Sequence, residues 1–117
     1  MLDDKKIIKR LMLDSKSVPW LRFFKYGEKY YTLKKIFKLA IDGKTGARVI
    51  LSQFYFEGEY GLSDKQFALD ILNFEVEQHP NIDKSIILLL QRFVGRQTSA
   101  PSTINSKFSN VISVRKY

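Results

Sequence analysis

One polar turn near the middle of the chain carries the residue types of two reactive sites. Gly43-Lys44-Thr45 matches the end of a phosphate-binding loop, but that motif needs glycine five positions earlier, where this chain has Lys38. Asp42 and Lys44 have the acid-x-lysine spacing of metal-dependent nucleases, in which the acid holds a divalent ion and the lysine stabilises developing charge. Such a site needs a further upstream acid, for which Asp14 is the available residue. A polar turn is the simpler interpretation.

Other residues capable of catalysis are few and badly spaced. His79 is the only histidine, with no Ser/His/Asp set around it and no second imidazole for a zinc site, and the absence of cysteine excludes a thiolate nucleophile. The acid pairs Glu57/Glu59 and Glu75/Glu77 are two residues apart, which places the partners on different faces of a helix. We interpret them as a solvated rim. We therefore predict no catalytic residue, no metal site, no cofactor and no enzymatic activity.

Cations interleaved with aromatic rings are the remaining chemical signal, and they are concentrated between residues 20 and 31. Rings stack on nucleic-acid bases and lysines meet phosphates, which is the physics of single-strand binding. The alternative is that most of these rings belong to the core and that the lysines solvate its edge. The predicted nucleic-acid contacts, to DNA or RNA, are Arg22, Lys25, Lys29, Lys34, Lys35, Lys38, Arg115 and Lys116.

Charge is segregated along the 117-residue chain, whose net charge is +8. Residues 1–50 hold 13 Lys/Arg against 5 Asp/Glu, residues 51–95 hold 3 against 7, and residues 96–117 hold 4 against none. The basic ends either meet a polyanion or neutralise the acidic middle of the same chain or of a partner. No signal peptide or membrane-length apolar run is present, so we expect a cytoplasmic protein, in the host-cell interior or the virion if it is viral, with no membrane partner.

Apolar residues recur at helical spacing through most of the chain, which predicts an all-α fold of five or six short helices. The competing interpretation is α+β, with a hairpin that turns at Asp42–Gly46 and pairs residues 33–41 with 47–56. An aromatic strand also competes with the helix that we expect Ser17 to cap. The expected helices are Asp3–Leu13, Ser17–Tyr26, Glu28–Ile41, Ala47–Phe56, Ser63–Gln78 and Ile82–Val94.

The ends of the last two expected helices have local signals. Ser63 and Gln66 have capping-box spacing, and Leu62 precedes them where it can pack on Phe67. The dipeptide His79-Pro80 ends that helix, because a residue before proline is disfavoured in helical conformation. The next helix is apolar nearly all round, so we expect it to be the buried centre of the core, ending at Gly95.

Residues 50–72 carry a leucine and Ser-Gln-aromatic before a glycine, followed by Leu-Ser-x-Lys-Gln. This segment resembles a short helix–loop–helix piece found in assorted bacteriophage and DNA-metabolism proteins. The resemblance covers about a fifth of the chain and includes no catalytic residue. It implies helices on both sides of the loop and a viral or mobile-element origin.

Composition shifts after Gly95, so we divide the chain into a helical domain, 1–95, and an extended basic arm, 96–117. Our leading hypothesis is a small, basic, non-enzymatic protein that contacts nucleic acid through a lysine-rich helix face and this arm. The alternative is a protein–protein interaction module, such as a viral assembly component or an inhibitor of a host protein, that uses the arm for partner binding or self-association. The apolar arm residues that would carry this contact are Phe108, Val111, Ile112 and Val114.

Overall fold

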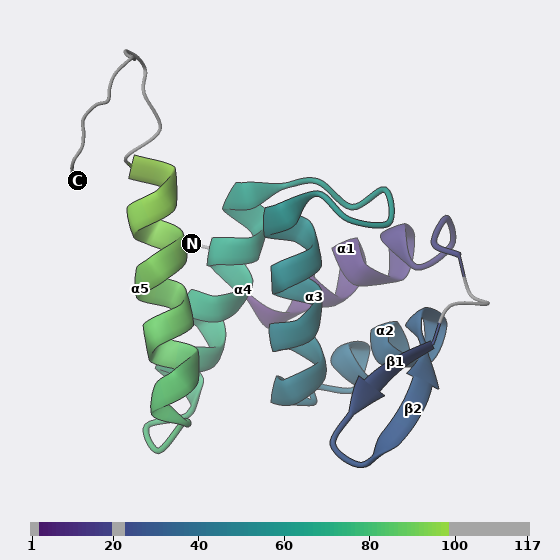
Figure 1. Cartoon of the computed structure of the whole chain (residues 1–117), viewed down its shortest axis with the longest axis horizontal. Helices are drawn as coiled ribbons and strands as arrows, with labels where there is room; N and C mark the ends of the chain where they lie inside the picture. Colours follow the sequence, from purple (N-terminus) through teal and green to yellow (C-terminus); the bar gives the residue numbers. More distant parts are fainter. Residues whose placement is uncertain (1–2, 20–22, 99–117) are drawn as a thin grey trace.

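The computed structural model describes residues 3–19 and 23–98, and within them the fold is mostly helical (Figure 1). Five helices and one two-stranded sheet make up the described chain. Their bounds are α1 Asp4–Asp14, β1 Phe23–Tyr26, β2 Lys29–Thr32, α2 Leu33–Ile41, α3 Thr45–Glu57, α4 Lys65–Gln78 and α5 Lys84–Thr98. The all-α prediction is therefore right about the helical bundle and wrong about residues 23–32.

Helix α3 lies at the centre of the core, packed against α2 and α4 (Figure 1). Its side chains Ala47, Leu51 and Tyr55 recur every four residues and are buried. Apolar residues of α2 and α4 at the same helical spacing close over them from both sides. The core is therefore organised around α3 and not around the apolar helix near the C-terminus that the sequence suggested.

Helix α5 is peripheral, although its sequence is the most continuously apolar. It packs beside α4, and Phe93 is its one buried side chain among those described, stacked on Phe56 at 4.0 Å between ring centroids. Leu88 is 60% exposed, because a helix with neighbours on one side buries one face only. The helix also continues through Gly95 to Thr98, so the predicted stop is wrong. No described helix is both long and apolar enough to cross a bilayer.

An antiparallel hairpin stands where two helices were expected. Strands β1 and β2 pair around Gly27, whose φ of +68° suits a tight turn and would strain another residue. The predicted helix capped by Ser17 is therefore wrong over the strand, and the competing strand interpretation is right there. Helix α2 begins at Leu33 and not at Glu28, because Thr32 is its N-cap and its hydroxyl accepts the Lys35 N–H at 3.1 Å.

The turn between α2 and α3 decides between the two predicted folds. Asp42 ends α2 and Gly43 follows with a φ of +94°, after which α3 begins at Thr45. Helices flank the turn on both sides, so the hairpin alternative at Asp42–Gly46 is wrong. The helical spacing of apolar residues in segments 33–41 and 47–56 distinguished the helical fold from the hairpin alternative.

Helix α4 is capped one residue later than expected. Asp64 is the N-cap, and its Oδ1 accepts the Phe67 N–H at 2.9 Å, so the capping box at Ser63 and Gln66 is wrong. Asp64 also accepts a hydrogen bond from Arg10 of α1 and forms an ion pair with it. A serine at the N-cap has no charge and could not form this ion pair. The predicted end at His79 is confirmed.

Candidate nucleic-acid interface

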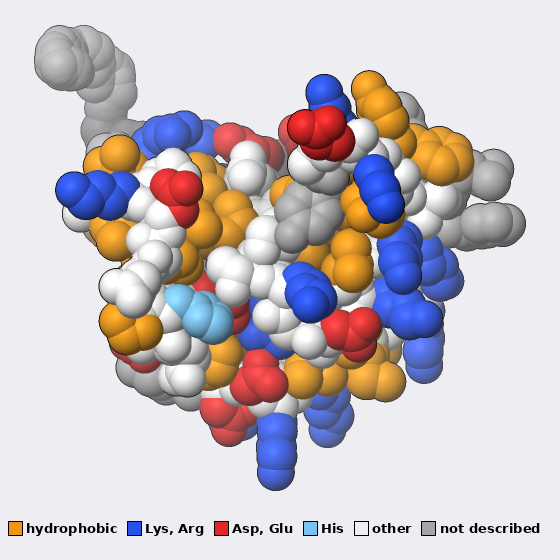
Figure 2. Space-filling view, turned by 90° about the horizontal axis from the view of Figure 1, so that it is seen from below, with side chains coloured by type: hydrophobic (Ala, Val, Ile, Leu, Met, Phe, Trp, Pro, Cys, Tyr) orange, Lys and Arg blue, Asp and Glu red, His pale blue; other side chains and the backbone are white. Residues whose placement is uncertain are grey.

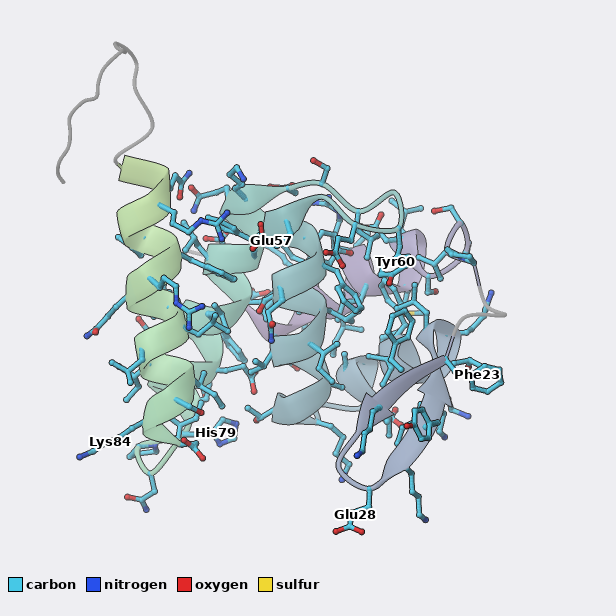
Figure 3. The ribbon with its side chains drawn as sticks, viewed as in Figure 1. Phe23, Glu28, Glu57, Tyr60, His79 and Lys84 are labelled. Carbon is cyan, nitrogen blue, oxygen red and sulfur yellow. The ribbon has the colours of Figure 1, made fainter. Side chains whose placement is uncertain are left out.

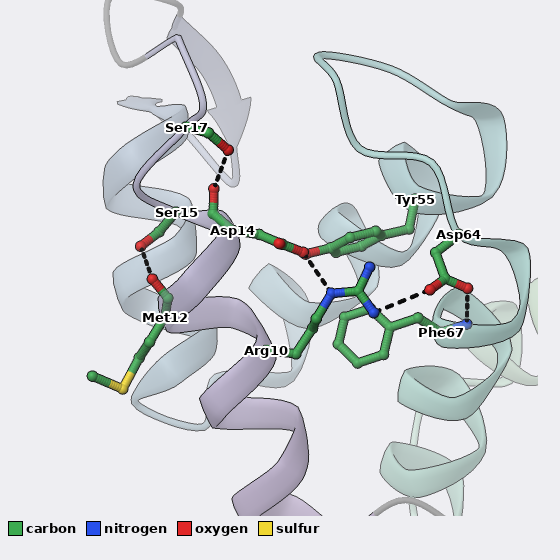
Figure 4. A network of polar contacts seen from close by, with 8 residues as sticks. All are labelled: Arg10, Met12, Asp14, Ser15, Ser17, Tyr55, Asp64 and Phe67. Atoms are coloured by element: carbon green, nitrogen blue, oxygen red, sulfur yellow. Dashed lines mark hydrogen bonds and ion pairs between the residues drawn. The ribbon is translucent and has the colours of Figure 1, made fainter.

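Arg10 fixes helix α1 to α3 and α4 (Figure 4). Its Nε donates to Asp14 Oδ2 at 2.9 Å, its Nη1 donates to Asp64 Oδ2 at 3.0 Å, and its guanidinium lies 4.6 Å from the Phe67 ring centroid. Tyr55 Oη donates to the same Asp14 oxygen at 2.5 Å. Burial, reinforced by this bond, raises the pKa of the Tyr55 hydroxyl. Asp14, the upstream acid of the nuclease hypothesis, is thus engaged in holding helices together.

A second ion pair is buried between α3 and α4. Arg48 Nη1 donates to Glu75 Oε2 at 2.9 Å, and Arg48 Nε donates to the Ala40 carbonyl at 2.8 Å. Thr45 Oγ1 donates to the other Glu75 oxygen at 2.6 Å. Arg48 Nη2 lies 2.8 Å from Asp4 Oδ1, close enough for an ion pair but without hydrogen-bond geometry. The prediction that Glu75 is a solvated rim residue is therefore wrong.

Arginines and lysines have different roles in the described structure. Arg10, Arg48 and Arg96 form internal ion pairs, the last with Glu57 at 2.7 Å. Among the described residues, no lysine forms an ion pair. Three acids of the acidic middle, Glu57, Asp64 and Glu75, are paired with arginine, whose planar fork suits buried and bidentate pairing. Lys65 donates to the Phe56 carbonyl at 3.0 Å, whereas the lysines of the hairpin and α2 are exposed to solvent.

Helix α2 presents the predicted lysine face. Lys34, Lys35 and Lys38 are exposed because the alternate stripe of the helix carries its buried apolar residues. Figure 2 shows lysine and arginine side chains gathered toward the right of the molecule, the side of α2 and the hairpin in Figure 1. A groove of about 470 Å³ runs beside these lysines, and Thr32 and Ile41 also line it.

The hairpin divides its aromatic rings between core and solvent. On its inner face, Phe24 packs on Phe54 and Tyr60, with ring centroids 5.2 and 5.1 Å away. On the outer face, Phe23 and Tyr30 are 65% and 67% exposed, because successive residues of a strand point to opposite sides. Figure 3 shows Phe23 pointing away from the body of the protein.

The outer face of the hairpin combines these rings with a cation and leads into the α2 groove. Lys25 is directly opposite Tyr30 in the sheet register, and Phe23 is opposite Thr32, so all four residues share one face. Thr32 also lines the groove beside the α2 lysines. Rings, a lysine and a lysine-rich helix therefore form one continuous surface.

Of the eight predicted cationic contacts, the structure brings together Lys25 on the outer face of the hairpin and Lys34, Lys35 and Lys38 on α2. Lys29 is exposed, but the sheet register places it on the other face of the hairpin. The other three predicted contacts, Arg22, Arg115 and Lys116, lie outside the described residues. The predicted partner-binding residues Phe108, Val111, Ile112 and Val114 also lie outside them. Phe23 and Tyr30 were absent from the predicted site. Their alternation with lysine in the sequence was the available signal.

The region around His79 is the other place with polar chemistry. His79 is half-exposed, and its Nε2 lies 3.5 Å from Glu75 Oε1. It borders a groove of about 430 Å³ with Thr45, Asp83 and Ile86. Across residues 3–19 and 23–98, no three histidine, aspartate or glutamate side chains gather as a metal site. The carboxylate of Glu75 is already engaged by Arg48 and Thr45.

Comparisons with known proteins assign no family to this surface. No protein-family model, curated protein or solved structure matches the chain. The lysines and exposed rings of the hairpin and α2 are therefore the basis for assigning a function.

Proposed function

We propose that this protein binds single-stranded DNA or RNA without catalysing a reaction. The binding surface is the outer face of the hairpin together with the lysine face of α2. One observation supports the proposal above the others. Phe23 and Tyr30 are exposed on the same face as Lys25, and that face continues into the α2 lysines.

The exposed rings favour a single strand over a duplex. Every base has a π-face, so a ring in solvent can stack on any unpaired base with little sequence preference. In a duplex the bases are already stacked on one another, and Phe23 and Tyr30 would have nothing to contact. The lysines then meet phosphates of the same strand, which adds affinity that falls with salt concentration.

The ring contribution is tested by fluorescence anisotropy with a labelled single-stranded oligonucleotide at low salt. Stacking is worth about 1–3 kcal/mol per base, so the pair Phe23→Ser/Tyr30→Ser should weaken binding by at least about tenfold. Leu88→Ser is the matched control, because it removes a side chain of similar exposure from α5, away from this surface. An unchanged affinity for the ring variant, or a duplex bound as tightly as the single strand, would contradict the proposal.

The lysine contribution is measured from the salt dependence of the same titration. Each phosphate contact contributes about −0.7 to the slope of log K against log salt for a single strand, so Lys34→Gln/Lys38→Gln should flatten it by about 1.4. Lys84→Gln/Arg92→Gln removes two exposed cations from α5 and should leave it unchanged. Arg115→Gln/Lys116→Gln measures the predicted share of the C-terminal arm. The proposed function itself would be refuted if full-length protein bound the oligonucleotide no more tightly than with a millimolar dissociation constant.

A further inference from the structure

A second groove lies along helix α1, distinct from the hairpin face. Its volume is about 710 Å³, and it reaches Ile41 at the end of α2. Met12 and Leu13 line it and are 53% and 63% exposed. Two adjacent apolar side chains in solvent beside a concave surface are a contact site for another apolar group.

The rim of this α1 groove is positively charged. Lys6, Lys9 and Lys16 line it, and no carboxylate does. These lysines are exposed and form no ion pair among the described residues. Lys6, Lys9 and Leu13 recur every three to four positions along one side of α1, and Lys16 follows in the turn after the last helical residue, Asp14. The groove therefore has an apolar floor, formed by Met12, Leu13 and Ile41, with the unpaired lysines beside it on α1 and in the turn that follows.

We propose that the α1 groove binds an acidic amphipathic helix of a partner protein. Such a helix places its apolar stripe on Met12, Leu13 and Ile41 and its carboxylates beside the rim lysines, which is the helix-in-groove mode of recognition. Charge complementarity selects this occupant. The chain's own segment 99–117 has three Lys/Arg and no acid, so the rim repels it. Nucleic acid fits poorly, because the floor offers aliphatic groups and no exposed ring for a base.

The probe is a fluorescein-labelled peptide of about 14 residues with leucine at helical spacing and glutamate at most other positions. Full-length protein should raise its anisotropy with micromolar affinity, and added salt should weaken the complex. A scrambled peptide of the same composition and a version with lysine in place of glutamate should bind at least about tenfold more weakly.

Variants locate the binding on the protein. Met12→Gln/Leu13→Gln and Lys6→Gln/Lys9→Gln should each weaken peptide binding by about tenfold, and their exposed positions leave the fold intact. Leu88→Gln and Lys84→Gln are the matched controls on α5 and should bind as the unaltered protein does. Far-UV circular dichroism confirms that each variant is folded.

Three results would overturn the proposal. The first is equal binding of the amphipathic and scrambled peptides. The second is an unchanged affinity in both α1 variants. The third is a dimer of the unaltered protein, seen by light scattering, that Met12→Gln/Leu13→Gln makes monomeric, because a second copy would then occupy the groove. Oligonucleotide binding is measured on the same variants and depends on Phe23 and Tyr30, so the failure of one activity is distinguishable from the failure of the other.

Discussion

Loss of the Glu75 carboxylate should destabilise the fold more than loss of any exposed charge. Glu75 and Arg48 have side-chain exposures of 2% each and are 2.9 Å apart. Removing one partner of a buried ion pair typically costs about 3–5 kcal/mol, because the other charge is left desolvated. In Glu75→Gln the guanidinium keeps Asp4 and the Ala40 carbonyl, and Thr45 keeps an acceptor, so we expect the lower end, about 3 kcal/mol.

The converse variant and the double variant complete a thermodynamic cycle. Arg48→Met leaves a buried carboxylate whose remaining hydrogen-bond donor is Thr45, so we expect a loss of about 3–5 kcal/mol. Arg48→Met/Glu75→Gln leaves no unpaired buried charge and should cost no more than the worse single variant. The resulting coupling energy should exceed about 2 kcal/mol.

Urea unfolding followed by far-UV circular dichroism measures these values, since the described chain is mostly helical. Asp4→Asn is the control, because Asp4 is half-exposed and its pairing with Arg48 should contribute at most about 1 kcal/mol. Single variants that each lose less than about 1 kcal/mol, or a double variant whose loss equals their sum, would refute the reasoning. Either result would mean that water or a local shift already solvates the pair.

Three further predictions concern the core and the α4 cap. Asp64→Ala removes both the hydrogen bond from the Phe67 N–H and the ion pair with Arg10, so it should lower the free energy of unfolding by about 2 kcal/mol. Asp64→Asn keeps the N-cap hydrogen bond and should lose about half of that, as measured by urea unfolding. Hydrogen bonds from the Phe67 N–H and from Arg10 lower the pKa of Asp64, so its contribution to the free energy of unfolding is complete above the unfolded value of 3.8 and is lost as the pH falls below it. Asp64→Asn should therefore lose less stability than the unaltered protein when unfolding is measured from about pH 5 down to about pH 2. Leu51→Ala should lower the free energy of unfolding by about 2–5 kcal/mol, because the side chain is fully buried. The control Leu88→Ala removes an exposed side chain and should lower it by less than about 1 kcal/mol. Equal losses of stability in thermal melts would contradict the assignment of α3 as the core helix.

Periodicity in the sequence predicted the helices that face the core on one side. Helix α2 alternates a buried apolar stripe with Lys34, Lys35 and Lys38, and helical spacing alone determines that those lysines face solvent. The same holds for α1, where Asp3, the first residue of the expected helix, is the N-cap and accepts the Lys6 N–H at 2.9 Å. Local rules were sufficient wherever a helix has one apolar face and a capping side chain.

Features that depend on distant neighbours could not be predicted in this way. The apolar run of α5 indicated burial, but burial also requires partners on several sides, and α5 packs against the bundle along one face. Arg48 lies one helical turn before buried Leu51, so its position on the apolar face of α3 could be predicted from the sequence. The identity of its partner, Glu75, depends on how α3 and α4 pack. Rings at 23–31 fit a helix or a strand, and the positive φ of Gly27, around which the hairpin turns, is known only from the structure.

The two proposed surfaces meet, which leads to a last prediction. The α1 groove and the groove beside α2 share Ser15 and Ile41, so an acidic helix in the first brings carboxylates close to Lys34 and Lys38. Those carboxylates would repel phosphates and screen the lysines within about 10 Å at 0.1 M salt. A saturating amount of the amphipathic glutamate peptide should therefore weaken oligonucleotide binding severalfold at low salt, and less at high salt. In Met12→Gln/Leu13→Gln the peptide should have no such effect. An oligonucleotide affinity that the bound peptide leaves unchanged would mean that the two surfaces act independently.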